Sequence, residues 1–372
     1  MRIRRLTAAF AALPFLLCGC WDNVDISRQN YAMSLWLGAD ESGIRCLIQC
    51  CDPVASADGD GTANTVDVPG GGVNISDALD NATRNSSKTI TYEHLQLIVI
   101  DRSLYGERAA ECMEFFLRSA DVQKTVNVVI CDDEPEAMFE IKPAGEAFYE
   151  YVSGLLASDL PSGSRTIQGS SLLAACRLEK EGRAFFLNRL RYDAEKDTVL
   201  PDGVGIFSNA SLRGFIGADE WEYYRLFETS EKEFSVSCSV EGYGENMGFR
   251  CISSGCRMSA ERTGGGFALR ARIEASFTLS EQAQGGGQPA LDRGFYPAAE
   301  AALRGEIRRR CEALAFVAQR ELRADFLGFG RAAEDAYPDW WSENSEKWDA
   351  VFAASPITYD ITCSVITGGD AK

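Results

Sequence analysis

Gly266-Phe-Ala-Leu-Arg-Ala-Arg-Ile-Glu-Ala-Ser-Phe-Thr-Leu279 shows the clearest periodicity in this chain of 372 residues. Every second residue from Phe267 to Leu279 is apolar, and most of the residues between them are polar or charged. Such a long alternation indicates a β-strand with one face on a core and the other face in water. The stretch therefore predicts a long strand in a sheet that is covered on one side.

Three other segments complete the pattern around this strand. Alternation of apolar and polar residues also marks 234–240 and 357–365 as strands. Between them, apolar residues recur at the three- and four-residue spacing of an amphipathic helix. These helical positions are Leu303, Ile307, Cys311, Leu314 and Val317. We therefore predict a C-terminal domain, 232–372, in which an antiparallel sheet packs against one long amphipathic helix.

The first part of the chain mixes strand and helix patterns. The residues from Leu95 to Ile100 form an almost unbroken apolar run, which is typical of a strand buried on both faces. Alternation at 44–50 predicts another strand, and Ser76 is placed to cap a helix. The segment 53–73 is rich in Gly, Asp and Ser and is expected to be a long loop. These features predict an N-terminal α+β domain over 20–142.

A middle α+β domain is expected over 143–231. Helical patterns occur at 146–157 and 171–178, followed by short strands at 184–190, 203–208 and 211–216. The last two strands should form a hairpin, with its turn at Ser208 and Asn209. The predicted fold class is therefore α+β, with three mixed α/β domains.

Composition excludes several classes of function. The formal charge of −18 argues against nucleic acid binding, which depends on basic groups that displace counterions from phosphate. The single histidine, His94, rules out a multi-histidine zinc site and lies where a structural role is expected. The chain has no nucleophile elbow, Walker loop or complete dinucleotide fingerprint. We therefore expect no enzymatic activity, no metal and no bound cofactor.

The 13 cysteines lack the spacing of a metal or redox site, because the chain contains no Cys-x-x-Cys. Several fall on apolar faces of the predicted elements, so we interpret them as small buried hydrophobic residues. A disulfide between Cys46 and Cys50 or Cys51 remains open.

The N-terminus has the layout of a bacterial export signal. Three arginines precede an apolar run from Leu6 to Leu17, which is well short of the roughly 20 residues that span a bilayer. The sequence Leu17-Cys-Gly-Cys20 then forms a lipobox, in which Cys20 is acylated and the signal, residues 1–19, is cleaved between Gly19 and Cys20. An ordinary secretory signal is the alternative. Diacylglycerol and an N-acyl chain such as palmitate on Cys20 would hold the mature chain on its membrane, since two or three chains anchor stably.

Three blocks carry a resemblance to a known family. The first is Gly19-Cys20-Trp21-Asp22, and the second is His94 with the apolar strand that follows it. The third runs from Ala324 to Gly330 and continues through Trp340, Trp341 and Trp348. In this order they resemble the Ger(x)C family of spore germination lipoproteins, the C subunits of nutrient germinant receptors in endospore-forming bacteria.

The resemblance implies a non-enzymatic scaffold or coupling component of a germinant receptor. Its partners would be the A-type and B-type membrane subunits, and its location the outer face of the spore inner membrane. A lipid-anchored solute-binding protein of a transporter is the alternative function, and a lipid-anchored hydrolase is a third.

Five aromatic or acidic residues of these blocks are candidate partner contacts: Trp21, Asp22, Trp340, Trp341 and Trp348. Tryptophan is enriched at interface hot spots. The competing interpretation for the three C-terminal tryptophans is packing within the core.

Overall fold

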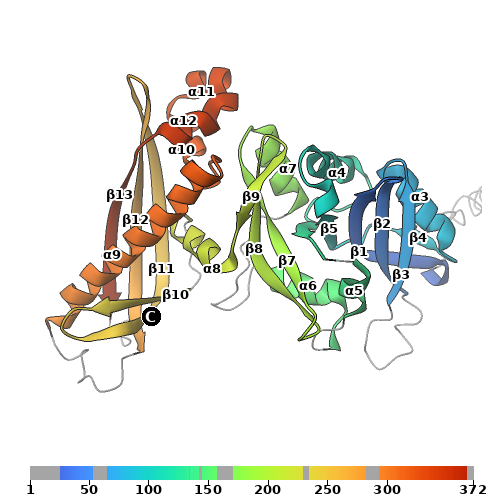
Figure 1. The fold of residues 1–372 in the computed structure, drawn as a ribbon, viewed down its shortest axis with the longest axis horizontal. Helices are drawn as coiled ribbons and strands as arrows, with labels where there is room; N and C mark the ends of the chain where they lie inside the picture. Colours follow the sequence, from blue (N-terminus) through green and yellow to red (C-terminus); the bar gives the residue numbers. More distant parts are fainter. Residues whose placement is uncertain are drawn as a thin grey trace, which may run out of the picture.

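The computed structural model describes residues 26–52, 65–133, 135–141, 145–156, 171–228, 234–281 and 293–366. Its strands form two separate sheets, one of nine strands and one of four. Figure 1 shows an elongated molecule with the larger sheet in one half and the smaller sheet, with its long helix α9, in the other. Both halves mix helices and strands, which confirms the predicted α+β class.

The larger sheet has the strand order β3-β2-β1-β5-β6-β7-β8-β9, with β4 paired to β1. Its central strands β1, β5, β6 and β7 run parallel, whereas antiparallel hairpins extend it at both ends. Its strands are β1 (Gln29–Asp40), β2 (Gly43–Cys51), β3 (Thr65–Gly72), β4 (Thr89–Thr91), β5 (Leu97–Asp101), β6 (Asn127–Cys131), β7 (Phe185–Asp193), β8 (Thr198–Ser208) and β9 (Ser211–Ile216).

Helices cover both faces of this sheet. Ile98 and Ile100 of β5 join a core on one face, and Leu97 and Val99 join a separate core on the other. This arrangement confirms that the apolar run before Asp101 is buried on both sides. The first face carries α3 (Ile75–Asn85), α4 (Glu107–Arg118) and α7 (Leu172–Lys180); the second carries α5 (Pro135–Glu140) and α6 (Phe148–Leu156).

The larger sheet crosses one of the expected domain boundaries. The boundary between 142 and 143 falls between β6 and β7, and these strands pair in parallel, with Val129 opposite Asn188. The boundary between 231 and 232 falls between the two sheets. The division into three domains therefore stays a prediction.

Part of the segment expected as a loop is an edge strand. Residues 53–64 lie outside the described part of the chain, but β3 pairs with β2 along its whole length. Helix α3 lies against β3, and Asn81 and Asn85 donate hydrogen bonds to the carbonyls of Gly71 and Pro69. The helix is capped by Asn74, not by Ser76 as expected. These amides satisfy backbone groups at a sheet edge that would otherwise be open to pairing.

The glycines of β3 fit closely beneath α3, and this fit gives a prediction. A Cβ on Gly70 would lie 2.3 Å from the carbonyl oxygen of Ala78, whereas one on Gly71 would come no closer than 3.7 Å to Ile44. We expect Gly70→Ala to lower the free energy of unfolding by about 1–3 kcal/mol, because overpacking forces the backbone to shift. Gly71→Ala is the matched control and should change it by less than about 0.5 kcal/mol. Equal effects in chemical denaturation would contradict this packing account.

The smaller sheet has the order β10-β11-β12-β13, and α9 lies across its apolar face. The predicted stripe is confirmed, since Leu303, Ile307, Cys311 and Leu314 are buried against the sheet. Its elements are β10 (Phe234–Val240), β11 (Gly244–Thr263), β12 (Gly266–Glu281), α9 (Phe295–Phe316) and β13 (Ile357–Ile366).

The expectation of a fully antiparallel sheet is wrong for its last strand. β13 runs parallel to β12, with Ile357 opposite Leu269. The chain leaves β12, crosses over through α9 and the helices that follow, and returns to the end of the sheet where β12 began. Parallel neighbours need such a crossover. Arg308 and Glu300 of α9 then hydrogen-bond to backbone groups of β13, which protects this edge as well.

Short helices join and flank the two sheets. Asn209 and Ala210 have positive φ and form the β8–β9 turn, one residue later than expected. Among the described residues no helix is long and apolar enough to cross a membrane. The remaining elements are η1 (Ile26–Arg28), η2 (Arg102–Leu104), α8 (Ala218–Trp221), η4 (Glu222–Leu226), η6 (Val317–Glu321), α10 (Phe329–Ala336), α11 (Pro338–Asn344), η7 (Ser345–Lys347) and α12 (Trp348–Ala354).

The cysteines of the described residues are free thiols, and most of them are buried. Burial raises the pKa of Cys46 to about 11 and that of Cys50 to about 12, which keeps these thiols protonated at neutral pH. The interpretation of these residues as small core hydrophobes is confirmed for the buried members. Cys46 and Cys50 are not joined by a disulfide.

Candidate functional site

The N-terminal candidate residues Gly19, Cys20, Trp21 and Asp22 lie outside the described residues. Acylation of Cys20, cleavage after Gly19 and partner contact through Trp21 and Asp22 therefore stay predictions. The C-terminal candidates are all described and lie on α11 and at the start of α12.

The three C-terminal tryptophans do not form an exposed aromatic surface. Trp341 and Trp348 are only 5% and 2% exposed, and their rings lie 5.4 Å apart within the core of the smaller sheet. Trp340 is half-buried and packs edge-on against Phe267 of β12. The role of Trp341 and Trp348 as partner contacts is corrected to packing, because side chains this deeply buried offer no surface to a partner. Trp340 keeps part of its surface exposed.

Trp348 instead holds a buried carboxylate at the start of α10. Its indole Nε1 donates a hydrogen bond to Asp325 Oδ2 at 2.7 Å, and Asp325 is 5% exposed. Oδ1 of the same carboxylate accepts from the backbone N–H groups of Gly328 and Phe329, and Oδ2 accepts from that of Gly330. Asp325 thus satisfies the free donors at the first turn of the helix and fixes that turn to α12.

Two glycines make this arrangement possible. Gly328 has a φ of +100°, a conformation that side-chain-bearing residues rarely adopt. A Cβ on Gly330 would lie 2.8 Å from Nε1 of Trp348 and 2.9 Å from the ring of Trp341. Within the block from Ala324 to Gly330, glycine is therefore required at 328 by the backbone conformation and at 330 by the close packing of Trp341 and Trp348.

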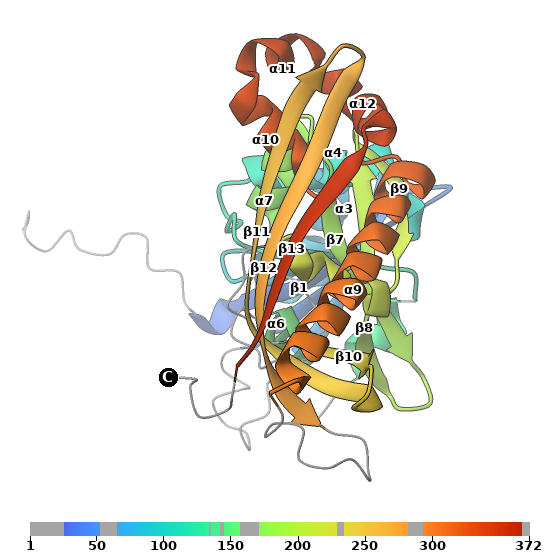
Figure 2. The same cartoon turned by 90° about the vertical axis from the view of Figure 1, so that its left-hand side faces the viewer.

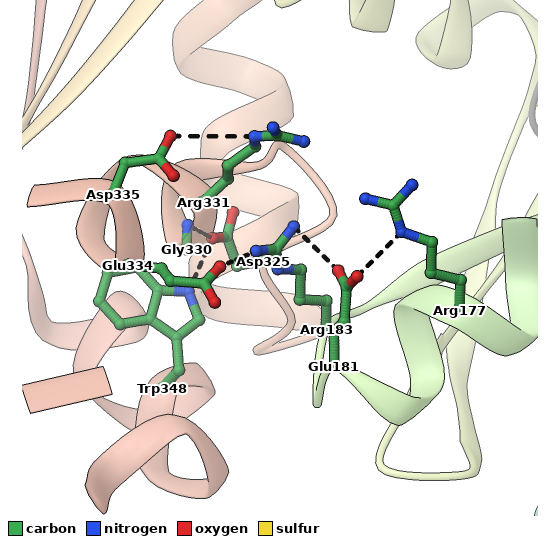
Figure 3. A network of polar contacts seen from close by, with 9 residues as sticks. All are labelled: Arg177, Glu181, Arg183, Asp325, Gly330, Arg331, Glu334, Asp335 and Trp348. Carbon is green, nitrogen blue, oxygen red and sulfur yellow. Dashed lines mark hydrogen bonds and ion pairs between the residues drawn. The ribbon is translucent and has the colours of Figure 1, made fainter. Parts of the chain in front are cut away.

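The helix capped by Asp325 also contacts the other half of the molecule. Arg183, in the turn between α7 and β7, forms an ion pair with Glu334 of α10. Arg183 also lies 3.2 Å from Glu181, which pairs with Arg177 of α7 at 2.9 Å. Figure 3 shows this chain of charges running from α7 to α10, beside Asp325 and Trp348. We call the nine residues drawn there the junction: Arg177, Glu181, Arg183, Asp325, Gly330, Arg331, Glu334, Asp335 and Trp348.

A second polar contact joins the halves close to the junction. The hydroxyl of Ser208, at the end of β8, donates to the carboxylate of Asp349 in α12. Asp349 also accepts from the backbone N–H of Asp325 at 3.2 Å. Two separate acids, Glu334 of α10 and Asp349 of α12, therefore connect this part of the molecule to the half that contains the larger sheet.

Aromatic side chains pack between the halves beneath these charges. Trp221 of α8 is fully buried, stacks on Tyr224 at 4.4 Å and meets Phe186 of β7 edge-on at 4.7 Å. Phe326, next to Asp325, lies 5.9 Å from the Trp221 ring. A cavity of about 200 Å³ remains at this contact, lined by residues of both halves.

The chemistry of Asp325 is that of a structural cap. Burial raises its pKa to about 6, although the hydrogen bonds from Trp348 and the backbone lower it. A carboxylate has about four lone-pair positions, and four donors already occupy them. All of its acceptor positions are therefore used by donors of the protein itself, and none is directed at a substrate. Among the described residues no cluster of three or more His, Cys, Asp or Glu side chains could hold a metal.

The raised pKa of Asp325 predicts a pH dependence of stability. The folded state binds a proton more tightly than the unfolded chain, whose pKa is near the ordinary value of 3.8. The contribution of Asp325 to the free energy of unfolding should therefore fall as pH rises from about 4 to 6 and stay constant above that range. At about 1.4 kcal/mol per pKa unit, the difference between wild type and Asp325→Asn should shrink by about 3 kcal/mol. A difference that is constant from pH 4 to pH 7 would contradict this.

The sequence pointed to the side of the junction formed by α10 and Trp348, but not to the side formed by Glu181 and Arg183. The block from Ala324 to Gly330 and Trp348 were singled out, but as motifs whose contacts were unknown. Arg183 and Glu181 lie in an ordinary turn after a helix, and no spacing distinguishes them from other surface charges. Only the tertiary structure brings them to α10.

Comparison with known proteins covers both halves. The family described as spore germination protein N-terminal domain matches residues 22–190, and the family described as spore germination B3/GerAC like, C-terminal, matches residues 202–369. Spore germination protein B3 of Bacillus subtilis (strain 168) is 19% identical, over 98% of this chain and 99% of that protein. The crystal structure of the GerBC protein matches with a TM-score of 0.59 and 15% identity, over 90% of this chain and 98% of that one. The fold is therefore shared along almost the whole length.

Proposed function

The chain belongs to the GerAC-like family of spore germination proteins, and from this premise we propose that it acts as the C subunit of a nutrient germinant receptor. The observation that carries the proposal is the match of both halves, in order, to the two domains of that family. Because a relative named for spore germination aligns over nearly the full length, the proposal concerns the whole chain and not one module of it.

The proposed role is that of a non-enzymatic scaffold or coupling component. Asp325 is fully occupied by structural donors, and the junction joins the two halves by ion pairs, a hydroxyl–carboxylate contact and packed aromatic rings. Interfaces of this kind are suited to hold two bodies in one relative orientation. A force or contact applied to one half would then be transmitted to the other.

We further propose that the chain is attached to its membrane through acyl chains on Cys20. The lipobox at 17–20 supports this, since it follows a basic and then apolar N-terminus. The net charge of −18 is repelled by anionic headgroups, so attachment should depend on acyl chains and protein partners. The partners would be the A-type and B-type membrane subunits, with this chain on the outer face of the spore inner membrane.

The proposal is tested by removing the gene from its spore-forming host. Mutant spores should germinate at least tenfold more slowly with the nutrient that this receptor serves, and a wild-type copy should restore the rate. Germination triggered without nutrients should be unchanged, which controls for general damage to the spore. Normal germination of the mutant with every nutrient that the wild type uses would overturn the proposal.

A further inference from the structure

The face of the smaller sheet that points away from α9 is open and polar. Strand alternation puts Ala271, Ile273 and Ala275 of β12 in the core, so the residues between them point outward. Figure 2 shows β11, β12 and β13 with no helix in front of them. The outward side chains that line the centre of this face are Ser253, Arg257, Arg272, Glu274, Ser276, Thr362 and Ser364, and Asp360 of β13 lies beside Arg272 in the register.

This face is hollowed into a groove of about 570 Å³. Gly255, which lies opposite Glu274 in the register, has no side chain to fill the space, and a Cβ there would meet nothing within 4 Å. The neighbouring serines are also short. Ser276 and Ser364 hydrogen-bond to each other at 3.0 Å, and both line the groove. The groove is therefore a concave surface rich in hydroxyl groups.

Two arginines lie side by side at the groove. Arg257 of β11 lies directly opposite Arg272 of β12, and Arg270 is the next outward residue of β12. Like charges in directly opposite positions destabilise a sheet. Asp360 of β13 lies 3.8 Å from Arg270 and 3.9 Å from Arg272, but no carboxylate in the described part of the chain pairs with Arg257. The chain as a whole is acidic, with a formal charge of −18, so this local concentration of guanidinium groups is unusual and favours the binding of an anion.

The groove offers one acceptor beside these donors. Glu274 lines it one outward position along β12 from Arg272. A carboxylate at this place repels a fully ionised ligand but accepts a hydrogen bond from a ligand that carries a hydroxyl. Hydrogen phosphate and its monoesters combine such a hydroxyl with charged oxygens. Arginine binds phosphate oxygens in a bidentate manner, and serine hydroxyls add further donors.

We propose that this groove binds a phosphate group, with Arg257 and Arg272 holding its charged oxygens and the serine and threonine hydroxyls surrounding them. The phosphate could belong to a free solute or to a lipid headgroup, because the same donors recognise both. Binding would relieve the repulsion between the two arginines, so that the site is more stable when occupied.

The test uses the full chain in detergent and the double variant Arg257→Gln/Arg272→Gln. Calorimetric titration with inorganic phosphate, at an ionic strength held constant with chloride, should show saturable binding to the wild type. The double variant should bind at least tenfold more weakly. The control Arg108→Gln/Arg118→Gln makes the same charge change on α4 and should bind within twofold of the wild type. In the absence of phosphate, the double variant should unfold at the same or a higher temperature than the wild type, which shows that loss of binding is not loss of fold.

A second arm distinguishes the two sources of phosphate. The Cys20→Ala protein, which lacks the proposed acyl anchor, and the same protein carrying Arg257→Gln/Arg272→Gln are incubated with vesicles of phosphatidylglycerol and with vesicles of phosphatidylcholine. Binding to the first kind alone, lost in the double variant, would assign the site to anionic headgroups. Phosphate binding that survives in the double variant, or no binding to phosphate or to either vesicle, would overturn the proposal.

Discussion

Cys20→Ala is expected to release the protein from the membrane and to abolish its contribution to germination. Without the thiol no acyl chain can be attached, and each chain contributes about 0.8 kcal/mol per buried CH₂ group. Loss of two or three chains removes the stable anchor, so the protein should move from the membrane fraction to the soluble fraction. The measurement is fractionation of spores with quantification of the protein in both fractions, together with the rate of nutrient germination.

Cys18→Ala is the control for this experiment. Cys18 lies within the predicted signal, so its substitution should leave both membrane retention and germination unchanged. Retention of the Cys20→Ala protein on the membrane at the wild-type level, with normal germination, would show that acylation of Cys20 is not what holds it there.

Asp325→Ala is expected to destabilise the protein strongly. It leaves the indole N–H of Trp348 and three backbone N–H groups without their acceptor. A lost helix cap costs about 0.5–2 kcal/mol, and a buried unsatisfied donor costs about 1–3 kcal/mol. We expect the free energy of unfolding to fall by about 3 kcal/mol at neutral pH, as measured by chemical denaturation.

Asp335→Ala is the matched substitution in the same helix. Asp335 is exposed and lies 3.8 Å from Arg331, an ion pair that should contribute less than about 1 kcal/mol. If Asp325→Ala destabilised the protein no more than Asp335→Ala does, the carboxylate of Asp325 would not be the cap that the structure describes.

Periodic patterns predicted those elements whose buried faces appear in the sequence as a regular spacing of apolar residues. The alternation from Phe267 to Leu279 gave β12, the stripe from Leu303 to Leu314 gave α9, and the apolar run before Asp101 gave β5. In each case one face, or both, is buried by many neighbours, so local pattern and tertiary contact agree.

Features that depend on distant contacts were not predictable. The direction of β13 depends on how the chain returns after α12, and nothing within 357–366 encodes it. β3 was expected as a loop because its glycines have no strand preference, yet they are needed for the close approach of α3. Likewise, the ion pair between Arg183 and Glu334 joins residues far apart in the chain. The sequence alone did not distinguish burial from exposure for Trp341 and Trp348, because their burial depends on tertiary contacts.

The architecture also bears on the alternative of a solute-binding protein. That function requires two lobes built from repeated βαβ units with parallel sheets. The smaller sheet instead consists of consecutive hairpins from β10 to β12, with only β13 parallel. The two halves therefore do not repeat one another, and the receptor subunit remains the function that the structure supports best.

The most direct test of the central claim is affinity purification of the full chain from detergent-solubilised spore membranes, followed by mass spectrometry. The account predicts that two integral membrane proteins copurify with it in near-equal amounts and that its first residue is an acylated Cys20. Recovery of the chain alone, with an unmodified N-terminus, would contradict it.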